Sequence, residues 1–172
     1  MSITLIIGGA RSGKSKYAEE LAAKSNLPVS YVATSTAIDS EMEARIAHHK
    51  TRRPESWLVF ECPLELADLL KSEAKKEQTI LVDCLTLWLN NQLHKNSQQN
   101  FSLLFSELIN SIKNTRAHII FVTNEVGLGI IPLGEITRQF VDEAGRLNQQ
   151  MAQTANQVVF MVAGLPMTLK NV

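Results

Sequence analysis

The chain has 172 residues, of which 45% are hydrophobic and 20% are charged, a size and composition typical of one compact domain with a substantial core. Lysine plus arginine and aspartate plus glutamate each total 17, and the formal net charge of zero excludes a general electrostatic attraction to nucleic acid or to an anionic membrane. No apolar run approaches membrane-spanning length, and we expect a cytoplasmic protein without a membrane span, with Cys62 and Cys84 as reduced thiols.

Short apolar or β-branched runs alternate with helix-compatible segments along the whole chain. This alternation predicts an α/β fold, with a mostly parallel central sheet flanked by helices, in a single domain over residues 1–172. The runs around Ile80 and Ile119 are apolar almost throughout, as expected for central strands. The expected strands are Thr4–Ile7, Val29–Ala33, Trp57–Phe60, Thr79–Val82, His118–Val122 and Val158–Val162, and the expected helices are Lys16–Ala23, Glu41–Lys50, Leu64–Lys75, Phe101–Asn114 and Thr137–Thr154.

The first strand is followed directly by GGARSGKS, which matches the phosphate-binding pattern G-x-x-x-x-G-K-[ST] of P-loop NTPases. In such a strand-loop-helix unit, backbone N–H groups surround phosphate oxygens and the helix directs the positive end of its dipole at them. A chance glycine-rich turn is the alternative, and random sequence of this length would contain the pattern on the order of one time in a hundred. We therefore predict a catalytic nucleotide-binding domain whose loop consists of Gly8, Gly9, Ala10, Arg11, Ser12, Gly13, Lys14 and Ser15.

Two side chains of this loop have specific expected roles. Lys14 would reach the β- and γ-phosphates and act in catalysis, and the Ser15 hydroxyl would ligate Mg²⁺. Asp83 ends the strand Thr79–Val82 as a Walker-B acid would, and it is the second expected Mg²⁺ ligand. The alternative role for Asp83 is to cap the following helix, which begins near Cys84.

A basic cluster lies in EMEARIAHHKTRRP, residues 41–54. The spacing of Met42, Ile46 and His49 places His49 on the apolar face of a helix, whereas His48 lies on the other side. A neutral imidazole can attack phosphorus as a nucleophile or carry a proton. The alternative is a solvated basic helix end, because cations are favoured there whatever the function.

Two later segments complete the pattern. Residues 90–100, NNQLHKNSQQN, are polar and amide-rich, and we expect an exposed connection without a functional role. TNEVGLGIIP leaves the strand around Ile119 as a glycine-containing loop, in which Glu125 could ligate metal or act as a base. A stiff turn in which Asn124 satisfies backbone groups is the equal alternative.

Taken together, GGARSGKS, the strand exit Ala33-Thr34-Ser35, the His48-His49-Lys50 cluster and TNEVGLGIIP resemble the bifunctional adenosylcobinamide kinase/adenosylcobinamide-phosphate guanylyltransferase family of cobalamin biosynthesis. The resemblance extends to the distal residues Arg138, Phe140, Asp142, Gly145, Arg146 and Asn148. It implies phosphorylation of adenosylcobinamide, followed by transfer of GMP from GTP through a guanylylated histidine to give adenosylcobinamide-GDP and pyrophosphate. It also implies ATP and GTP as co-substrates, Mg²⁺ as cofactor, and a homo-oligomer, with the homotrimer as the form associated with the family.

The resemblance also implies site residues. The nucleophile matches the histidine before Lys50, which is His49, with His48 as the local alternative. Asp83 stands where family members can have glutamate, and Arg52 occupies a position often filled by glycine. Besides the phosphate-binding loop, the implied nucleotide contacts are Thr34, Ser35, Thr36, Lys50, Thr51, Arg52, Arg53, Glu61 and Asp83.

Three alternatives compete with this interpretation. A P-loop small-molecule kinase would lack the covalent step, and a regulatory GTP switch would need an N-K-x-D element that the sequence lacks. A recombinase-like ATPase would need a polymer-binding surface, which neither the charge nor the length suggests. The sequence does not fix the phosphate donor or the general base of the kinase step, nor whether the two activities share one pocket.

Overall fold

The computed structural model describes residues 2–36, 54–74, 77–113 and 115–172. Within these ranges the elements are β1 (Ser2–Gly8), α1 (Lys14–Ala23), β2 (Val29–Ala33), β3 (Leu58–Glu61), α3 (Leu66–Glu73), β4 (Thr79–Asp83), α4 (Leu85–Lys95), α5 (Phe101–Ile112), β5 (His118–Asn124), α6 (Glu135–Thr154), β6 (Gln157–Val162) and β7 (Leu165–Asn171). No helix in the described ranges is both long enough and apolar enough to cross a lipid bilayer.

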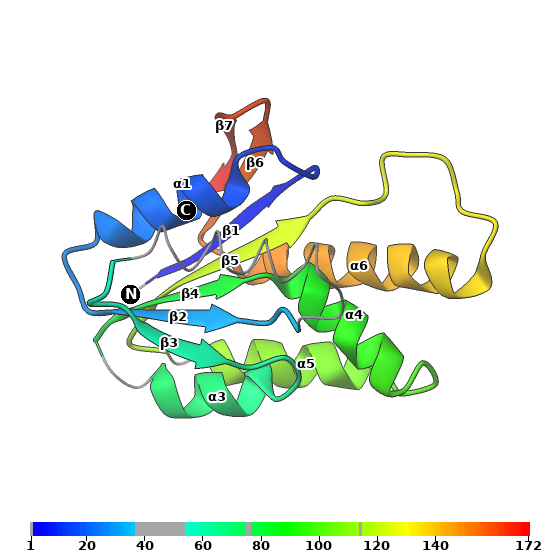
Figure 1. The fold of residues 1–172 in the computed structure, drawn as a ribbon, viewed down its shortest axis with the longest axis horizontal. Helices are drawn as coiled ribbons and strands as arrows, with labels where there is room; N and C mark the ends of the chain where they lie inside the picture. Colours follow the sequence, from blue (N-terminus) through cyan, green and yellow to red (C-terminus); the bar gives the residue numbers. More distant parts are fainter. Residues whose placement is uncertain (1, 37–53, 75–76, 114) are drawn as a thin grey trace.

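The strands form one seven-stranded sheet in the order β3-β2-β4-β5-β1-β6-β7. All neighbouring strands run parallel except β7, which pairs antiparallel with β6. The strands around Ile80 and Ile119 are central, and both residues are fully buried, as predicted. The carboxyl ends of the six parallel strands therefore lie at one edge of the sheet, which faces right in Figure 1.

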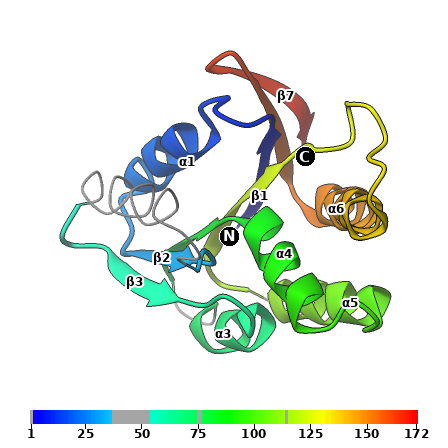
Figure 2. The same cartoon turned by 45° about the vertical axis from the view of Figure 1, so that its right-hand side comes forward.

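Helices cover the two faces of the sheet unequally. Figure 2 shows α1 on one face and α3, α4, α5 and α6 on the other. The α1 face holds a smaller cluster that includes Ile6, Ala18 and Tyr31, whereas the opposite face holds the larger cluster around Trp88 and Phe105. The predicted α/β fold with a mostly parallel sheet between helices is thus confirmed.

The prediction for residues 90–100 is wrong in its first half. Residues Asn90–Lys95 continue helix α4, and only the residues after Lys95 form the connection to α5. Gln92 lies on the buried face of α4, where its side-chain amide donates to the Leu64 carbonyl at 2.8 Å. A buried amide whose hydrogen bonds are satisfied packs like an apolar residue, and for that reason polarity alone misjudged this segment.

Strand β7 was not predicted from the sequence. Its residues are exposed almost throughout, and Pro166 lies within it, as is tolerated on an edge strand. A two-residue turn, Ala163-Gly164, connects it to β6, and both turn residues have positive φ. Such a turn matches the twist of an antiparallel pair.

Candidate nucleotide-binding site

The phosphate-binding loop lies between the end of β1 and the start of α1, as predicted. Gly13 adopts φ 95° and precedes the helix without a side-chain cap, and the first turn of α1 contains no acidic residue. Several N–H groups at a helix start have no intrahelical partner. The start of α1 therefore presents donors and a positive dipole end to an anion.

Lys14 lies across this loop rather than in solvent. Its ammonium donates to the Gly9 carbonyl at 2.6 Å, and the residue is only 7% exposed. Burial lowers the pKa of Lys14, and the nearby Cys84 and Asp83 charges act in the opposite direction. The Asp83 charge therefore acts on Lys14 from the end of β4.

The turn Ala163-Gly164 between β6 and β7 contacts the phosphate-binding loop at Ser12 and Gly13. The Gly164 N–H donates to the Ser12 carbonyl at 3.1 Å, and a Cβ on Gly13 would lie 3.3 Å from the Gly164 Cα. The Ser12 hydroxyl is buried and has no hydrogen-bond partner among the residues that the structure describes. A buried hydroxyl without a partner indicates a place where an anionic ligand can accept a hydrogen bond.

Asp83 ends β4, and its carboxylate does not cap the following helix. Cys84 is the N-cap of α4, and its sulfur accepts from the Leu87 N–H at 3.5 Å. The Asp83 carboxylate instead accepts a hydrogen bond from the Tyr31 hydroxyl at 3.1 Å. This geometry favours the ligand role of Asp83 over the capping role.

The residues that follow β2 and end β3 lie at the same edge of the sheet. Thr34 is fully buried, and its hydroxyl bonds to both the N–H and the carbonyl of Cys84, at 2.8 and 2.7 Å. Ser35 is half-buried, whereas Thr36 is exposed. Glu61 is the last residue of β3 and pairs with Ala33. Direct nucleotide contacts by these residues stay predictions, and Thr34 has a structural task of its own.

The end of β5 lies between β1 and β4 and is held by a polar network. Asn148 of α6 accepts from the Thr123 hydroxyl at 2.9 Å and donates to the Asn124 carbonyl at 3.1 Å. The Asn124 N–H donates to the Thr86 hydroxyl at 2.6 Å. Sequence reasoning named Asn148 only by resemblance, because its partners lie far away along the chain.

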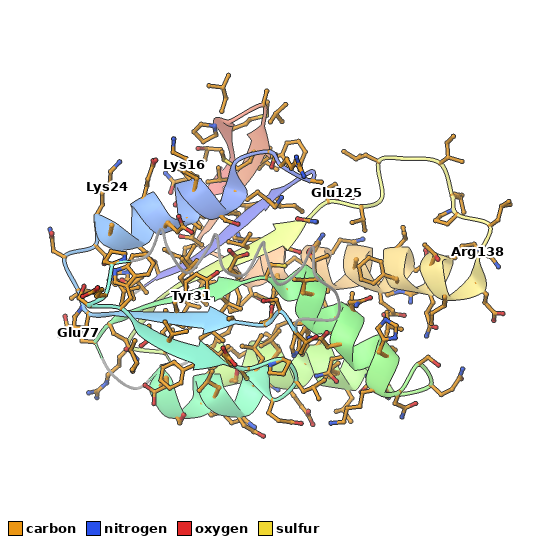
Figure 3. All side chains as sticks on the ribbon, in the orientation of Figure 1. Lys16, Lys24, Tyr31, Glu77, Glu125 and Arg138 are labelled. Carbon is orange, nitrogen blue, oxygen red and sulfur yellow. The ribbon has the colours of Figure 1, made fainter. Side chains whose placement is uncertain are left out.

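Glu125 begins the loop after β5, as Figure 3 shows. Its N–H donates to the Gly8 carbonyl at 3.0 Å, and its carboxylate accepts from the Gly127 N–H at 2.7 Å. The carboxylate therefore stabilises a local turn, whereas the alternative stated from the sequence assigned that task to Asn124. Contact with the Gly8 carbonyl nevertheless places this residue beside the phosphate-binding loop.

The expected Mg²⁺ ligands fit the chemistry of that ion. Ser15 and Asp83 offer oxygen atoms, and Mg²⁺ is commonly held by one or two carboxylates together with substrate phosphates and water. Among the described residues there is no group of three or more His, Cys, Asp or Glu side chains that could hold a metal. A site completed by nucleotide phosphates does not need such a group.

The remaining predicted site residues lie outside the described residues. They are His48, His49, Lys50, Thr51, Arg52 and Arg53, together with the predicted helix Glu41–Lys50.

The loop between β5 and α6 is unusual for its apolar surface. It projects from the body of the molecule (Figure 1). Ile130 and Leu133 are 97% and 98% exposed, and Leu128 and Ile131 are also largely exposed. Arg138 ties the end of this loop to α6 by donating to the Pro132 and Leu133 carbonyls. Exposed apolar groups that gather on one loop make it a candidate contact surface.

A separate cavity of about 550 Å³ lies between the α4–α5 connection, the start of α5 and α6. Its lining is rich in amide side chains such as Gln99 and Gln139. None of the predicted nucleotide-binding residues lines it, so the candidate site is the strand edge and not this cavity.

Solved structures share the fold at low sequence identity. The flagellar accessory protein FlaH from Methanocaldococcus jannaschii matches with a TM-score of 0.57 and 15% identity, over 99% of this chain and 78% of that one. The RadB recombinase matches with a TM-score of 0.56 and 16% identity, over 92% of this chain and 73% of that one. At this identity the likeness shows the fold alone.

Sequence relatives are much closer. The bifunctional adenosylcobalamin biosynthesis protein CobP of Pseudomonas aeruginosa is 52% identical over 166 residues, covering 96% of each chain. The protein of the same description, CobU, from Escherichia coli is 37% identical over 179 residues, covering 96% of this chain and 98% of that one. A family model described as cobinamide kinase / cobinamide phosphate guanyltransferase matches residues 4–169. The chain therefore belongs to the cobinamide kinase / cobinamide phosphate guanyltransferase family.

Proposed function

We propose that this protein phosphorylates adenosylcobinamide and then transfers GMP from GTP to adenosylcobinamide phosphate through a guanylyl-histidine. The observation that carries the proposal is the position of Lys14, which is buried in the first turn of α1 and feels the charge of Asp83. The chain is also 52% identical to a bifunctional relative. A triphosphate held there would have its terminal phosphates among Lys14 and the loop amides. ATP and GTP are the proposed co-substrates.

In the kinase step the loop positions the γ-phosphate for attack by the substrate hydroxyl. The substrate oxygen bonds to the γ-phosphorus while its bond to the leaving nucleoside diphosphate breaks, and the hydroxyl proton passes to a base or to water. Catalysis of this kind comes mainly from placement and electrostatic stabilisation. Lys14, the loop N–H groups and the Ser12 hydroxyl are the proposed donors to the phosphate oxygens.

In the transfer step we assign the nucleophile to His49, with His48 as the alternative. A neutral ring nitrogen attacks the α-phosphorus of GTP, pyrophosphate leaves, and the ring loses its proton. An oxygen of adenosylcobinamide phosphate then attacks the same phosphorus, the P–N bond breaks, and the imidazole regains a proton. Lys50, Thr51, Arg52, Arg53, Thr34, Ser35, Thr36 and Glu61 are proposed nucleotide contacts.

The proposed metal ligands are Ser15 and Asp83. Bound Mg²⁺ would neutralise charge that develops on the phosphate oxygens. The two protein oxygens would fix its place at the strand edge, between the loop and β4.

We further propose a homo-oligomer, with the homotrimer as its specific form. The exposed apolar side chains of the loop between β5 and α6 support subunit contacts there. A cytoplasmic location follows from the function, because ATP and GTP are available in that compartment.

Labelled GTP tests the covalent step. Protein incubated with [α-³²P]GTP should retain label that is lost in acid and kept in base. His49→Ala should abolish this label and guanylyl transfer, whereas His48→Ala, its matched neighbour, should retain both. If the wild type takes up no label while it still converts both substrates, the covalent mechanism is wrong. The products formed from adenosylcobinamide with ATP or GTP are identified by mass spectrometry. If only the phosphorylated product is found, the protein is a kinase without guanylyl transfer.

A further inference from the structure

We propose that Tyr31 is a positioning residue that orients the Asp83 carboxylate toward the bound metal and nucleotide. The proposal rests on the metal role of Asp83 in the proposed function. Its structural basis is the hydrogen bond from the Tyr31 hydroxyl to Asp83 Oδ2 at 3.1 Å, which joins two adjacent strands.

The strand register explains why these two residues meet. In the parallel pair β2 and β4, Tyr31 lies opposite Leu81 and Ala33 lies opposite Asp83. Residues two apart in a strand share a face, so Tyr31 and Asp83 both lie on the face covered by α1. Asp83 has Ala33 as its direct neighbour, and the small alanine side chain leaves room for the long tyrosine side chain to reach the carboxylate. Figure 3 labels Tyr31 among the side chains over these strands.

Packing fixes the position of the donor. Tyr31 is 2% exposed and belongs to the cluster formed with Ala18 and Ala22 of α1. The ring is therefore packed in the core cluster on the face of the sheet that α1, the helix beginning at Lys14, covers. A buried tyrosine hydroxyl needs a hydrogen-bond partner, and this partner is the predicted metal ligand.

The backbone of Asp83 is held from the same strand exit. The Thr34 N–H donates to the Asp83 carbonyl at 3.3 Å, and the Thr34 hydroxyl bonds to both backbone groups of Cys84. Asn91 in turn donates to the Thr34 carbonyl at 2.8 Å. With the backbone fixed, the main conformational freedom that remains to Asp83 is rotation about χ2, which has a broad energy minimum. A hydrogen bond to Oδ2 sets that torsion, and thereby the direction in which Oδ1 points.

Partners that orient a metal ligand commonly contribute about 10-fold or more to metal affinity. Tyr31→Phe retains the ring and removes only the hydroxyl. We expect Mn²⁺ binding to the GTP complex, followed by electron paramagnetic resonance, to weaken about 10-fold. GTP affinity in EDTA should change less than twofold, because the phosphate-binding loop is untouched.

Ser30→Ala is the matched control. Ser30 lies on the same strand, is 2% exposed, and donates to the Gln78 side chain at 2.8 Å rather than to the site. The Ser30→Ala substitution removes a buried hydroxyl that does not contact Asp83, so it should leave Mn²⁺ affinity unchanged. Equal weakening by Ser30→Ala and Tyr31→Phe would overturn the proposal, because a general loss of packing would then explain both.

Asp83→Asn separates this inference from the function beneath it. If Asp83→Asn weakens Mn²⁺ binding but Tyr31→Phe does not, Tyr31 has no positioning role and the metal role of Asp83 stands. If Asp83→Asn binds Mn²⁺ as the wild type does, the metal role itself is wrong, and the inference is overturned with it. Support requires that Tyr31→Phe weakens binding in the native background and adds no further loss in the Asp83→Asn background.

Discussion

The Lys14 ammonium and the Gly9 carbonyl close the phosphate-binding loop on itself through a hydrogen bond of 2.6 Å. This contact holds a cation over the loop. A phosphate oxygen that entered the loop would offer the ammonium a stronger, charged acceptor. The lysine is therefore placed for its proposed role in advance.

Replacing Lys14 by glutamine should remove most of the activity. We expect kcat/KM for both reactions to fall by roughly 10²- to 10³-fold, as when one donor to a developing charge is lost. Lys16→Gln is the matched control, because Lys16 points into solvent on α1 and lies 3.9 Å from Glu20 (Figure 3). Steady-state kinetics should separate the two variants; similar losses in both would argue against a direct phosphate contact by Lys14.

Gly8→Ala should damage the loop by crowding. An added Cβ would lie 2.5 Å from the Met161 carbonyl oxygen and 2.9 Å from the Ser12 hydroxyl. Because a backbone atom cannot move aside cheaply, we expect the free energy of unfolding to fall by about 1–3 kcal/mol. Gly9→Ala should cost much less, since nothing lies within 4 Å of its Cβ position. Urea denaturation of both variants checks this order, and a reversed order would contradict it.

Cys84 should make the free energy of unfolding decrease as the pH rises in the alkaline range. Burial, followed by the Asp83 charge, raises the pKa of the Cys84 thiol to about 11 from an ordinary value of 9.0. A raised folded-state pKa contributes stability that is complete below pH 9 and is lost as pH rises toward 11. The stability advantage of the wild type over Cys84→Ala should therefore shrink between pH 8.5 and about 10.5. Urea midpoints at both values measure it, and a constant difference would refute the assignment.

Asn148→Ala should loosen the end of β5. The change leaves the Thr123 hydroxyl and the Asn124 carbonyl without their amide partner, and losing a buried partner costs about 1–3 kcal/mol. The free energy of unfolding should fall by that amount, with faster hydrogen exchange at the Asn124 N–H. Gln149→Ala, at the exposed neighbouring position, should change neither quantity.

The apolar loop provides a test of assembly. Ile130→Asp combined with Leu133→Asp should convert the proposed oligomer to monomers, because charged side chains cannot be buried there without a large penalty. Sedimentation velocity measures the change. Ile130→Leu combined with Leu133→Ile keeps the apolar character and should preserve the oligomer, and a wild type that sediments as a monomer would contradict the proposal.

Two parts of the site, the phosphate-binding loop and the end of β4, were predicted from short sequence patterns. GGARSGKS and the apolar run before Asp83 carry their own context, so the loop and the end of β4 lie where they were expected. Tyr31 was missed because its partner is Asp83, and the contact depends on the register of β2 against β4. The only sequence signal was a tyrosine inside an apolar strand, whose hydroxyl required a partner.

Tertiary contacts decided the other elements. Residues 90–95 of helix α4 were predicted as a connection because Asn91 and Gln92 look like loop residues. Their amides, however, bond to backbone carbonyls of neighbouring segments. Strand β7 was missed although Leu165, Met167 and Leu169 alternate as in a strand, because Pro166 lies among them and a proline is tolerated only on an edge strand. In the structure these three apolar side chains are exposed.

The place of β1 in the sheet has a consequence for synthesis of the chain. β1 leaves the ribosome before the other strands of the sheet, yet its two neighbours, β5 and β6, begin at His118 and Gln157. Gly164, which donates to the loop that follows β1, comes later still. A nascent chain that ends before these residues has an unpaired, largely apolar strand and an unsupported loop. Nucleotide capture should therefore begin only late in translation, and until then β1 is a segment that chaperones would be expected to protect.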